Sequence, residues 1–154
     1  MKEVELLKKS MVEIEEVIAI EIEKANFVLT DYYSVWYEKN DNLDYEFKGH
    51  LMPRIKITKD TTTGEAKRVE IFWNYSGARR KTQHKYSAMK YIKKGKGSRY
   101  SDHTLSENTD QAWELSLAKE AEDKLELIRK RITSLYRIKK STKASINIYT
   151  GVTK

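Results

Sequence analysis

The sequence contains no cysteine, so disulfide bonds and thiolate metal sites are excluded. No apolar run approaches the roughly 20 residues that a membrane-spanning helix needs. The first residues, 1–5, are acidic and amphipathic, which does not fit a secretory signal. These absences predict a cytoplasmic protein with no membrane partner.

Motifs of catalysis are also missing. The three histidines, His50, His84 and His103, are far apart and none belongs to a metal-ligand pattern. No phosphate-binding loop occurs. Tyr32 and Tyr33 are similar to the paired tyrosines of some DNA-nicking enzymes, but those enzymes also need a histidine-bound metal, and packing within a helix is the plainer interpretation. We therefore expect no enzyme, no catalytic residue, no metal and no cofactor.

What the sequence does contain is segregated charge. The chain has 154 residues and a net charge of +7, and 15 of its 30 basic residues lie between residues 48 and 99 with only 3 acidic ones. Residues 1–47 are acidic. Such segregation creates a local positive field that attracts a polyanion, and nucleic acid is the favoured interpretation. The alternatives are a solvated surface, an acidic protein partner or an anionic membrane.

Apolar residues at near-heptad spacing predict a long amphipathic helix over residues 2–39. Its seam consists of Val4, Leu7, Met11, Ile14, Ile18, Ile22, Ala25, Leu29, Tyr32 and Trp36. A second helix is predicted over residues 108–140, because Asn108 and Gln111 have the spacing of N-cap and N3 residues. Residues 141–154 are expected to form a loose tail.

Residues 50–95 lose the helical periodicity and predict a basic β-meander. Period-two alternation around residues 54–58 and 68–75 predicts a hairpin, and residues 84–92 a third strand. The covered face should carry Ile55, Ile57, Val69, Ile71 and Trp73. The expected fold is a single α+β domain: a long N-terminal helix, a three-stranded antiparallel meander and a long C-terminal helix. The helices either pack as a coiled-coil-like hairpin with the sheet at one end, or pair with a second copy in a homodimer.

The central basic residues fall into three candidate nucleic-acid-binding sets. The predicted exposed face of the hairpin, which would read base edges in a major groove, carries Arg54, Lys56 and Arg68, with Asn74 at its end. A basic turn suited to phosphate contacts carries Arg79, Arg80 and Lys81. The third set interleaves with Tyr91 and Tyr100, which could stack on bases, and consists of Lys90, Lys93, Lys94, Lys96 and Arg99. For any single residue, a solvated charge is the alternative.

Several short stretches over about residues 50–140 resemble MobI-type conjugative transfer proteins. They are Pro53-Arg54-Ile55, Val69-Glu70-Ile71-Phe72-Trp73, Ile92-Lys93-Lys94-Gly95, Tyr100, Trp113-Glu114, Glu122 and Ile128-Arg129. These proteins are small auxiliary factors of integrative conjugative elements and large plasmids. The resemblance implies a relaxosome role: recognising the origin of transfer and helping to recruit the relaxase, which is a separate enzyme.

The expected function is therefore binding of double-stranded DNA by a homodimer in support of conjugative transfer. One alternative is a coiled-coil adaptor whose basic patch meets an acidic protein. The other is an RNA-binding regulator, because interleaved tyrosines and lysines also suit single strands.

Overall fold

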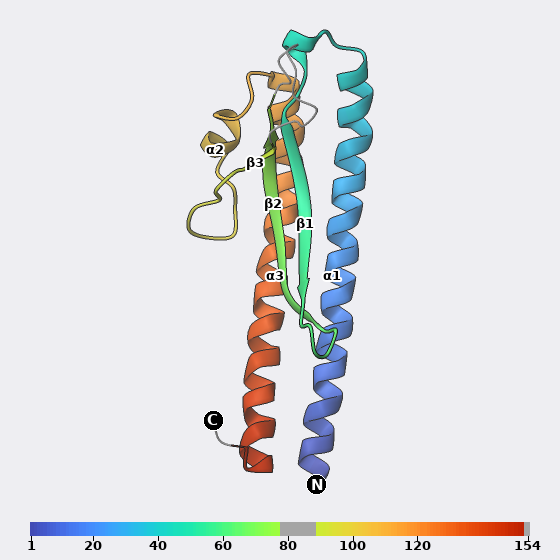
Figure 1. Ribbon diagram of the computed structural model, residues 1–154, viewed down its shortest axis with the longest axis vertical. Helices are drawn as coiled ribbons and strands as arrows, with labels where there is room; N and C mark the ends of the chain where they lie inside the picture. The colour runs from blue at the N-terminus through green and yellow to red at the C-terminus, as the bar shows by residue number, and fades with distance from the viewer. Residues whose placement is uncertain (78–88, 153–154) are drawn as a thin grey trace.

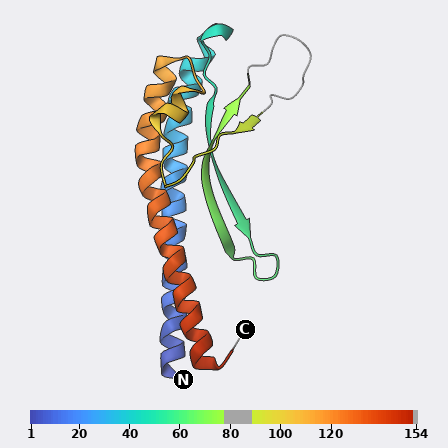
Figure 2. The same ribbon diagram turned by 90° about the vertical axis from the view of Figure 1, so that its left-hand side faces the viewer.

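The structure, a computed structural model, describes residues 1–77 and 89–152 and has two layers. Its long helices, α1 (Lys2–Asp41) and α3 (Ala112–Thr150), run antiparallel side by side (Figure 1). The sheet of β1 (Leu51–Lys59), β2 (Ala66–Ser76) and β3 (Met89–Tyr91) lies along one side of this pair (Figure 2). The α+β prediction and the helical hairpin are confirmed. The sheet, however, lies alongside the helices and not at one end of them.

The helix pair is held by the seam that the sequence predicts. Every seam residue of α1 is buried or half-buried, from Val4 near the start to Trp36 in the last turns. Small residues allow close approach, since Ala25 of α1 and Ala118 of α3 are fully buried. An ion pair between Lys139 and Glu15, 3.1 Å long, links the two helices near the tip of the β-hairpin. Within the described residues, neither long helix has an apolar stretch long enough to cross a membrane.

The sheet has the order β1-β2-β3, with both pairs antiparallel. Arg54 lies opposite Phe72 and Ile55 opposite Ile71, so alternate side chains face the helices. Ile71 and Trp73 are buried as predicted, but Ile57 is 40% exposed, which corrects its place on the covered face. Toward its tip the hairpin moves away from the helix pair (Figure 2), and Ile57 belongs to the half of β1 nearer that tip.

The second half of the chain differs from the prediction in its boundaries. A short helix, α2 (Asp102–Ser106), comes first and is capped by Ser101, whose hydroxyl accepts from the Thr104 amide at 3.1 Å. Asn108 is no N-cap: its side chain donates to the Thr104 carbonyl, and α3 begins at Ala112. The expected tail is wrong as well, because α3 continues to Thr150 and ends at Gly151 in a left-handed cap with φ of 71°.

The third strand is shorter than the predicted 84–92 in the part that the structure describes. β3 pairs with β2 only at residues 74–76, and Ile92 adds one further hydrogen bond, to the Trp73 carbonyl at 3.0 Å. The rest of the predicted strand, residues 84–88, lies outside the described residues.

Candidate nucleic-acid interface

A buried glutamate on α3 holds the sheet in place. The Glu122 carboxylate accepts from the Trp73 indole N–H of β2 at 2.9 Å and from the Tyr100 amide at 2.9 Å. Arg129, two helical turns further along α3, makes a bidentate ion pair with it at 2.6 and 2.9 Å. Arg129 also donates to the Ile71 carbonyl of β2 at 2.8 Å. This cluster fixes the middle of the sheet against α3.

A second buried glutamate fixes the top of the sheet. Glu114 accepts from the Trp36 indole N–H of α1 at 2.6 Å and from the amides of His50 and Leu51, at 2.8 and 3.0 Å, where β1 begins. Gly49 lies against the same carboxylate, where a side chain would not fit. One carboxylate therefore joins α3, α1 and β1.

Tyr32 and Tyr33 attach α1 to β1. The Tyr32 hydroxyl donates to the Leu51 carbonyl at 2.7 Å, and the Tyr33 hydroxyl to the Pro53 carbonyl at 2.6 Å. Burial raises the pKa of Tyr32 well above its ordinary value and that of Tyr33 to about 12. Both hydroxyls are thus neutral donors that position the strand, in agreement with the packing interpretation.

The raised pKa of Tyr33 predicts alkaline destabilisation. A tyrosine that titrates near 10 when unfolded and near 12 when folded makes the protein lose stability as pH rises through that interval. We expect the urea midpoint to fall less steeply over this range in Tyr33→Phe than in the wild type. Denaturation followed by circular dichroism at several pH values measures this, and parallel pH curves would contradict the assignment.

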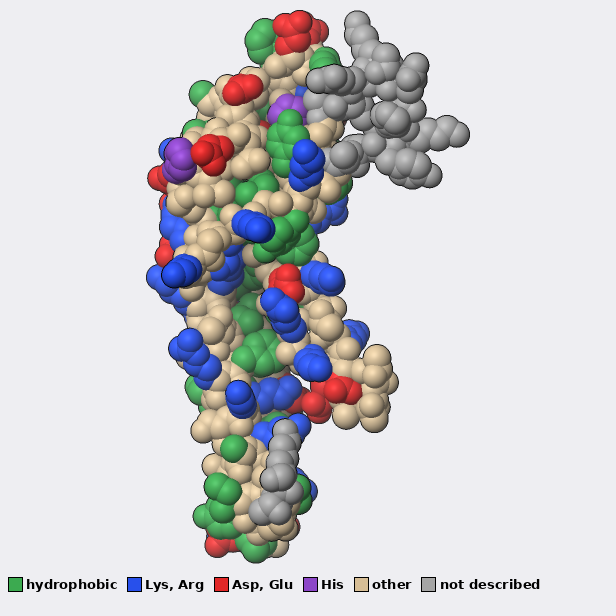
Figure 3. All heavy atoms as spheres, turned by 60° about the vertical axis from the view of Figure 1, so that its left-hand side comes forward, with side chains coloured by type: hydrophobic (Ala, Val, Ile, Leu, Met, Phe, Trp, Pro, Cys, Tyr) green, Lys and Arg blue, Asp and Glu red, His purple; other side chains and the backbone are tan. Residues whose placement is uncertain are grey.

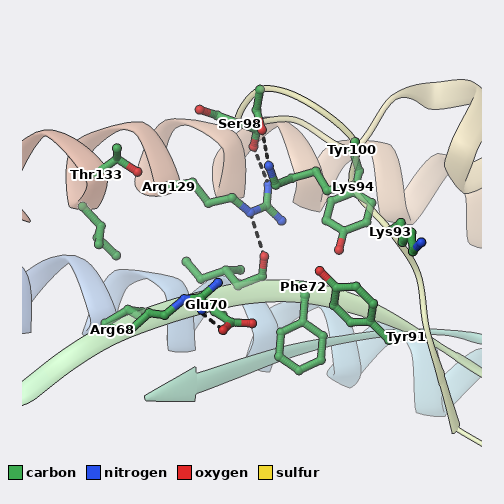
Figure 4. A pocket seen from close by; sticks show the side chains of 15 residues that line it. Arg68, Glu70, Phe72, Tyr91, Lys93, Lys94, Ser98, Tyr100, Arg129 and Thr133 are labelled. Carbon is green, nitrogen blue, oxygen red and sulfur yellow. Dashed lines mark hydrogen bonds and ion pairs between the residues drawn. The ribbon is translucent and has the colours of Figure 1, made fainter. Parts of the chain in front are cut away.

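These attachments leave the outer face of the sheet uncovered by any described element. We call it the outer face, and it comprises Met52, Arg54, Lys56 and Thr58 of β1, Arg68, Glu70, Phe72 and Asn74 of β2, and Met89 and Tyr91 of β3. Arg54 and Lys56 are exposed, and within the described residues no carboxylate pairs with either. Arg68, also exposed, forms an ion pair with Glu70 at 3.1 Å (Figure 4). The structure thus brings the first predicted set onto one open surface.

An aromatic pair extends the outer face. The rings of Phe72 and Tyr91 lie 5.5 Å apart, and Tyr91 is 57% exposed (Figure 4). Asn74 lies opposite Tyr91 in the β2–β3 ladder. Flat, exposed aromatic surface beside cations is suited to base stacking or to groove contacts.

The third predicted set is not one cluster. Lys90 lies opposite Tyr75, on the other face from Tyr91, and borders a hollow with Thr104 and Glu107 of the α2 region. Lys93 borders both this hollow and a groove beside β2 that Lys94 also lines, and Lys96 is exposed on the following loop. The structure thus spreads these lysines over more than one surface.

Arg99 and Tyr100 have structural roles. Arg99 pairs with Asp102, Asp123 and Glu126 at 3.1, 2.6 and 3.2 Å, so its charge is compensated locally. Tyr100 is fully buried and its hydroxyl donates to the Ile92 carbonyl at 2.8 Å, so the prediction that it stacks on bases is wrong. The turn set of Arg79, Arg80 and Lys81 lies outside the described residues.

Sequence reasoning missed a basic surface on the second half of α3. Arg137, Lys140 and Lys143 line a hollow beside the hairpin together with Lys67 of β2. Lys and Arg side chains gather along this side of the molecule, with apolar side chains between them (Figure 3). The signal was in the sequence, because residues three apart share a helix face, but two of them lay at or beyond the predicted end of the helix.

Together these contacts define a class: a two-layer α+β protein in which a helical hairpin supports a small antiparallel sheet with an open basic face. The chain belongs to the MobI protein family, which matches over residues 22–143. It is therefore a protein associated with conjugative transfer. No curated protein and no solved structure matches the chain significantly.

The family match begins earlier than the stretches that carry the resemblance. It takes in the second half of α1, which contains the residues that contact β1 and Glu114, namely Tyr32, Tyr33 and Trp36. Of the residues that carry the resemblance, Trp73, Tyr100, Glu114, Glu122 and Arg129 are buried and hydrogen-bonded to one another or to the backbone. They build the framework that presents the outer face.

Proposed function

We propose that this protein binds duplex DNA at the origin of transfer and helps to recruit the relaxase, without cutting DNA itself. The observation that carries the proposal is the open outer face. Arg54 and Lys56 stand there without carboxylate partners among the described residues, across β2 from the exposed Tyr91. Exposed cations on a rigid sheet attract phosphates and can reach base edges.

The shape of the hairpin supports a major-groove interaction. Antiparallel strands lie about 4.8 Å apart, so a two-stranded ribbon fits a groove about 12 Å wide. Arg54 and Lys56 are two positions apart on β1, so their side chains lie on the same face of the sheet. Arg68 and Phe72, four positions apart on β2, lie on that face too. The ribbon would therefore present side chains from both strands to successive base pairs.

A binding role also agrees with the tyrosines. A nucleophilic tyrosine attacks as the phenolate, whereas the Tyr32 and Tyr33 hydroxyls donate to β1 carbonyls and have raised pKa values. We therefore propose that strand cleavage belongs to a partner enzyme.

The homodimer and the cytoplasmic location stay predictions. For the homodimer we propose the side of α1 that faces away from α3 as the contact surface. It exposes Leu6, Val17, Ile20 and Phe27, at 57, 42, 49 and 63%. Two paired copies would present two outer faces to two half-sites.

Fluorescence anisotropy with a labelled origin-of-transfer duplex and a scrambled duplex, across a salt series, tests the proposal. We expect a preference for the origin duplex that persists as salt rises, because base contacts do not depend on counterion release. Weak binding, equal for both duplexes and lost at moderate salt, would contradict it and favour the adaptor function.

The outer face predicts which residues choose the sequence. Arg54→Ala with Arg68→Ala should reduce the ratio of affinities for the two duplexes by about tenfold, because bidentate arginine contacts discriminate between bases. Lys2→Ala with Lys9→Ala removes the same charge from exposed positions of α1 and is the control, with the ratio unchanged. Arg79→Ala with Arg80→Ala should weaken both affinities alike. If the Arg54/Arg68 pair and the Arg79/Arg80 pair lowered the affinities for the two duplexes in the same way, the assignment of these roles would be refuted.

A further inference from the structure

One edge of the central strand is left unpaired. β3 covers β2 only at residues 74–76, and after Ile92 the chain turns away through a loop whose Gly95 and Gly97 have φ of 81° and 92°. Below that point no strand among the described residues lies on this side of β2 (Figure 2). The free edge therefore extends over residues 67–71.

The backbone polar groups at this edge point outward in an alternating pattern. Ser76 donates to the His50 carbonyl on the β1 side, whereas Trp73 accepts from the Ile92 amide on the opposite side. Because successive residues of a regular strand direct their N–H and C=O groups to opposite sides, Val69 and Ile71 face the free edge. The alternation ends at Lys67, where the pairing with β1 shifts register. The Ile71 carbonyl already accepts a hydrogen bond from the Arg129 side chain. The Ile71 N–H and both backbone polar groups of Val69 face a space without a neighbouring strand in the described chain.

A groove runs along this edge. Its volume is 680 Å³, with β2 on one side, Ile132 and Thr133 of α3 on another, and the loop of Lys93 and Lys94 above (Figure 4). It meets the hollow beside the hairpin, since both are lined by Val69, Ile132 and Thr133. The two together form a channel parallel to β2, which is the shape that an extended chain occupies.

The charge of the channel is positive. Within the groove the ion pairs Arg129–Glu122 and Arg68–Glu70 neutralise two of the arginines. Among the described residues, no carboxylate lies within ion-pair distance of seven further cations of the channel: Lys8, Lys67, Lys93, Lys94, Arg137, Lys140 and Lys143. Asp60 attracts Lys67 and Lys143 at longer range. A segment that fits here would carry acidic side chains.

We propose that the free edge of β2 binds an extended acidic segment of a partner protein by β-strand addition. The segment pairs with residues 67–71 on the same side of β2 as β3, and its carboxylates face the lysines and Arg137 of the channel. This goes beyond DNA binding and does not depend on it. The edge adjoins the outer face, since Arg68, Glu70, Phe72 and Tyr91 also line the groove, but strand addition uses the backbone of residues 67–71 and not the side chains of Arg54 and Lys56.

The backbone pattern favours a polypeptide over a nucleic acid. Donors and acceptors that alternate along a strand are complementary to the main chain of another strand, while a nucleic-acid backbone offers acceptors but no matching row of donors. Lysines next to an edge can also serve only to prevent aggregation, and this alternative predicts that no peptide binds.

The test uses the full-length protein and a short synthetic peptide in which Glu and Val alternate. In nuclear magnetic resonance spectra we expect the peptide to shift the amide signals of Val69 and Ile71, which face the edge. The signals of Arg68 and Glu70, whose amides face β1, should shift less. Shifts confined to lysine side chains, or no binding, would overturn the proposal.

Two perturbations separate strand addition from charge attraction. Val69→Pro removes an edge N–H without removing a hydrogen bond to β1, and should weaken peptide binding about tenfold. Arg54→Ala with Lys56→Ala, on the outer face, is the matched control and should leave peptide affinity unchanged. Independently of folding, a peptide N-methylated at every residue should bind the wild type at least about tenfold more weakly, because it keeps its charge but has no donors.

Equal binding of the methylated and unmethylated peptides would overturn the proposal. Displacement of the peptide by a single-stranded oligonucleotide of equal charge, together with no effect of Val69→Pro, would assign the channel to nucleic acid instead. Failure of the origin duplex to bind, with the peptide still bound at β2, would refute the proposed function and leave this inference standing.

Discussion

Glu122→Ala should destabilise the protein by about 3–5 kcal/mol, because it leaves a buried arginine without its counter-charge. Arg129 is only 8% exposed and cannot recover its hydration without moving. The change also removes the acceptor of the Trp73 indole N–H and of the Tyr100 amide, which are buried donors. Urea denaturation followed by circular dichroism measures the free energy of unfolding.

Two companion variants isolate the cause. Glu120→Ala removes an exposed carboxylate from the same helix and should change stability by no more than about 0.5 kcal/mol. Glu122→Leu with Arg129→Met removes both charges and should be less destabilising than Glu122→Ala alone. If the double variant is the less stable of the two, the unpaired charge is not the cause.

Gly49→Ala is expected to cost about 2–4 kcal/mol, although it adds a single methyl group. An added Cβ would lie 2.6 Å from the Glu114 Cδ and 2.8 Å from the Trp36 Nε1, and closer still to a carboxylate oxygen. The carboxylate must therefore move, which breaks the hydrogen bonds that join α3 to α1 and to the start of β1. Thermal or urea unfolding measures the loss.

Trp36→Phe provides the control for that explanation. It keeps an aromatic ring but removes the N–H that Glu114 accepts. If Gly49→Ala acts by displacing Glu114 from Trp36, the double variant Gly49→Ala with Trp36→Phe should lose about 1 kcal/mol less stability than the sum of the two single variants. Strictly additive costs would place the damage of Gly49→Ala elsewhere.

The elements that the sequence predicts well are those with local periodicity. The apolar residues from Val4 to Trp36 repeat with the period of a helix, and those around Ile71 and Trp73 alternate with the period of a strand. Each stretch therefore predicts its own secondary structure. The hairpin arrangement of strands and the exposed Arg54, Lys56 and Arg68 follow from the same alternation. These features place the outer face without any tertiary information.

The errors lie where distant residues decide the outcome. Isoleucines at 146 and 148 suggested weak alternation, but α3 continues because no helix breaker occurs before Gly151. Tyr100 and Arg99 were assigned to nucleic acid because local sequence shows only their type. Their partners, Glu122 for the Tyr100 amide and Asp123 for Arg99, are more than 20 positions away along the chain.

The helical hairpin extends beyond the tip of the β-hairpin, so the molecule has a bare two-helix stem (Figure 1). A helix of 40 residues is about 60 Å long. The Lys139–Glu15 ion pair lies where the stem begins, near Glu65 of the β2 side of the hairpin tip. If DNA binds the sheet as we propose, the stem would act as a spacer that sets the distance between that DNA and any protein bound at the far end of the stem. Lengthening or shortening both helices by whole turns would therefore change the reach of the complex and leave its binding surfaces intact.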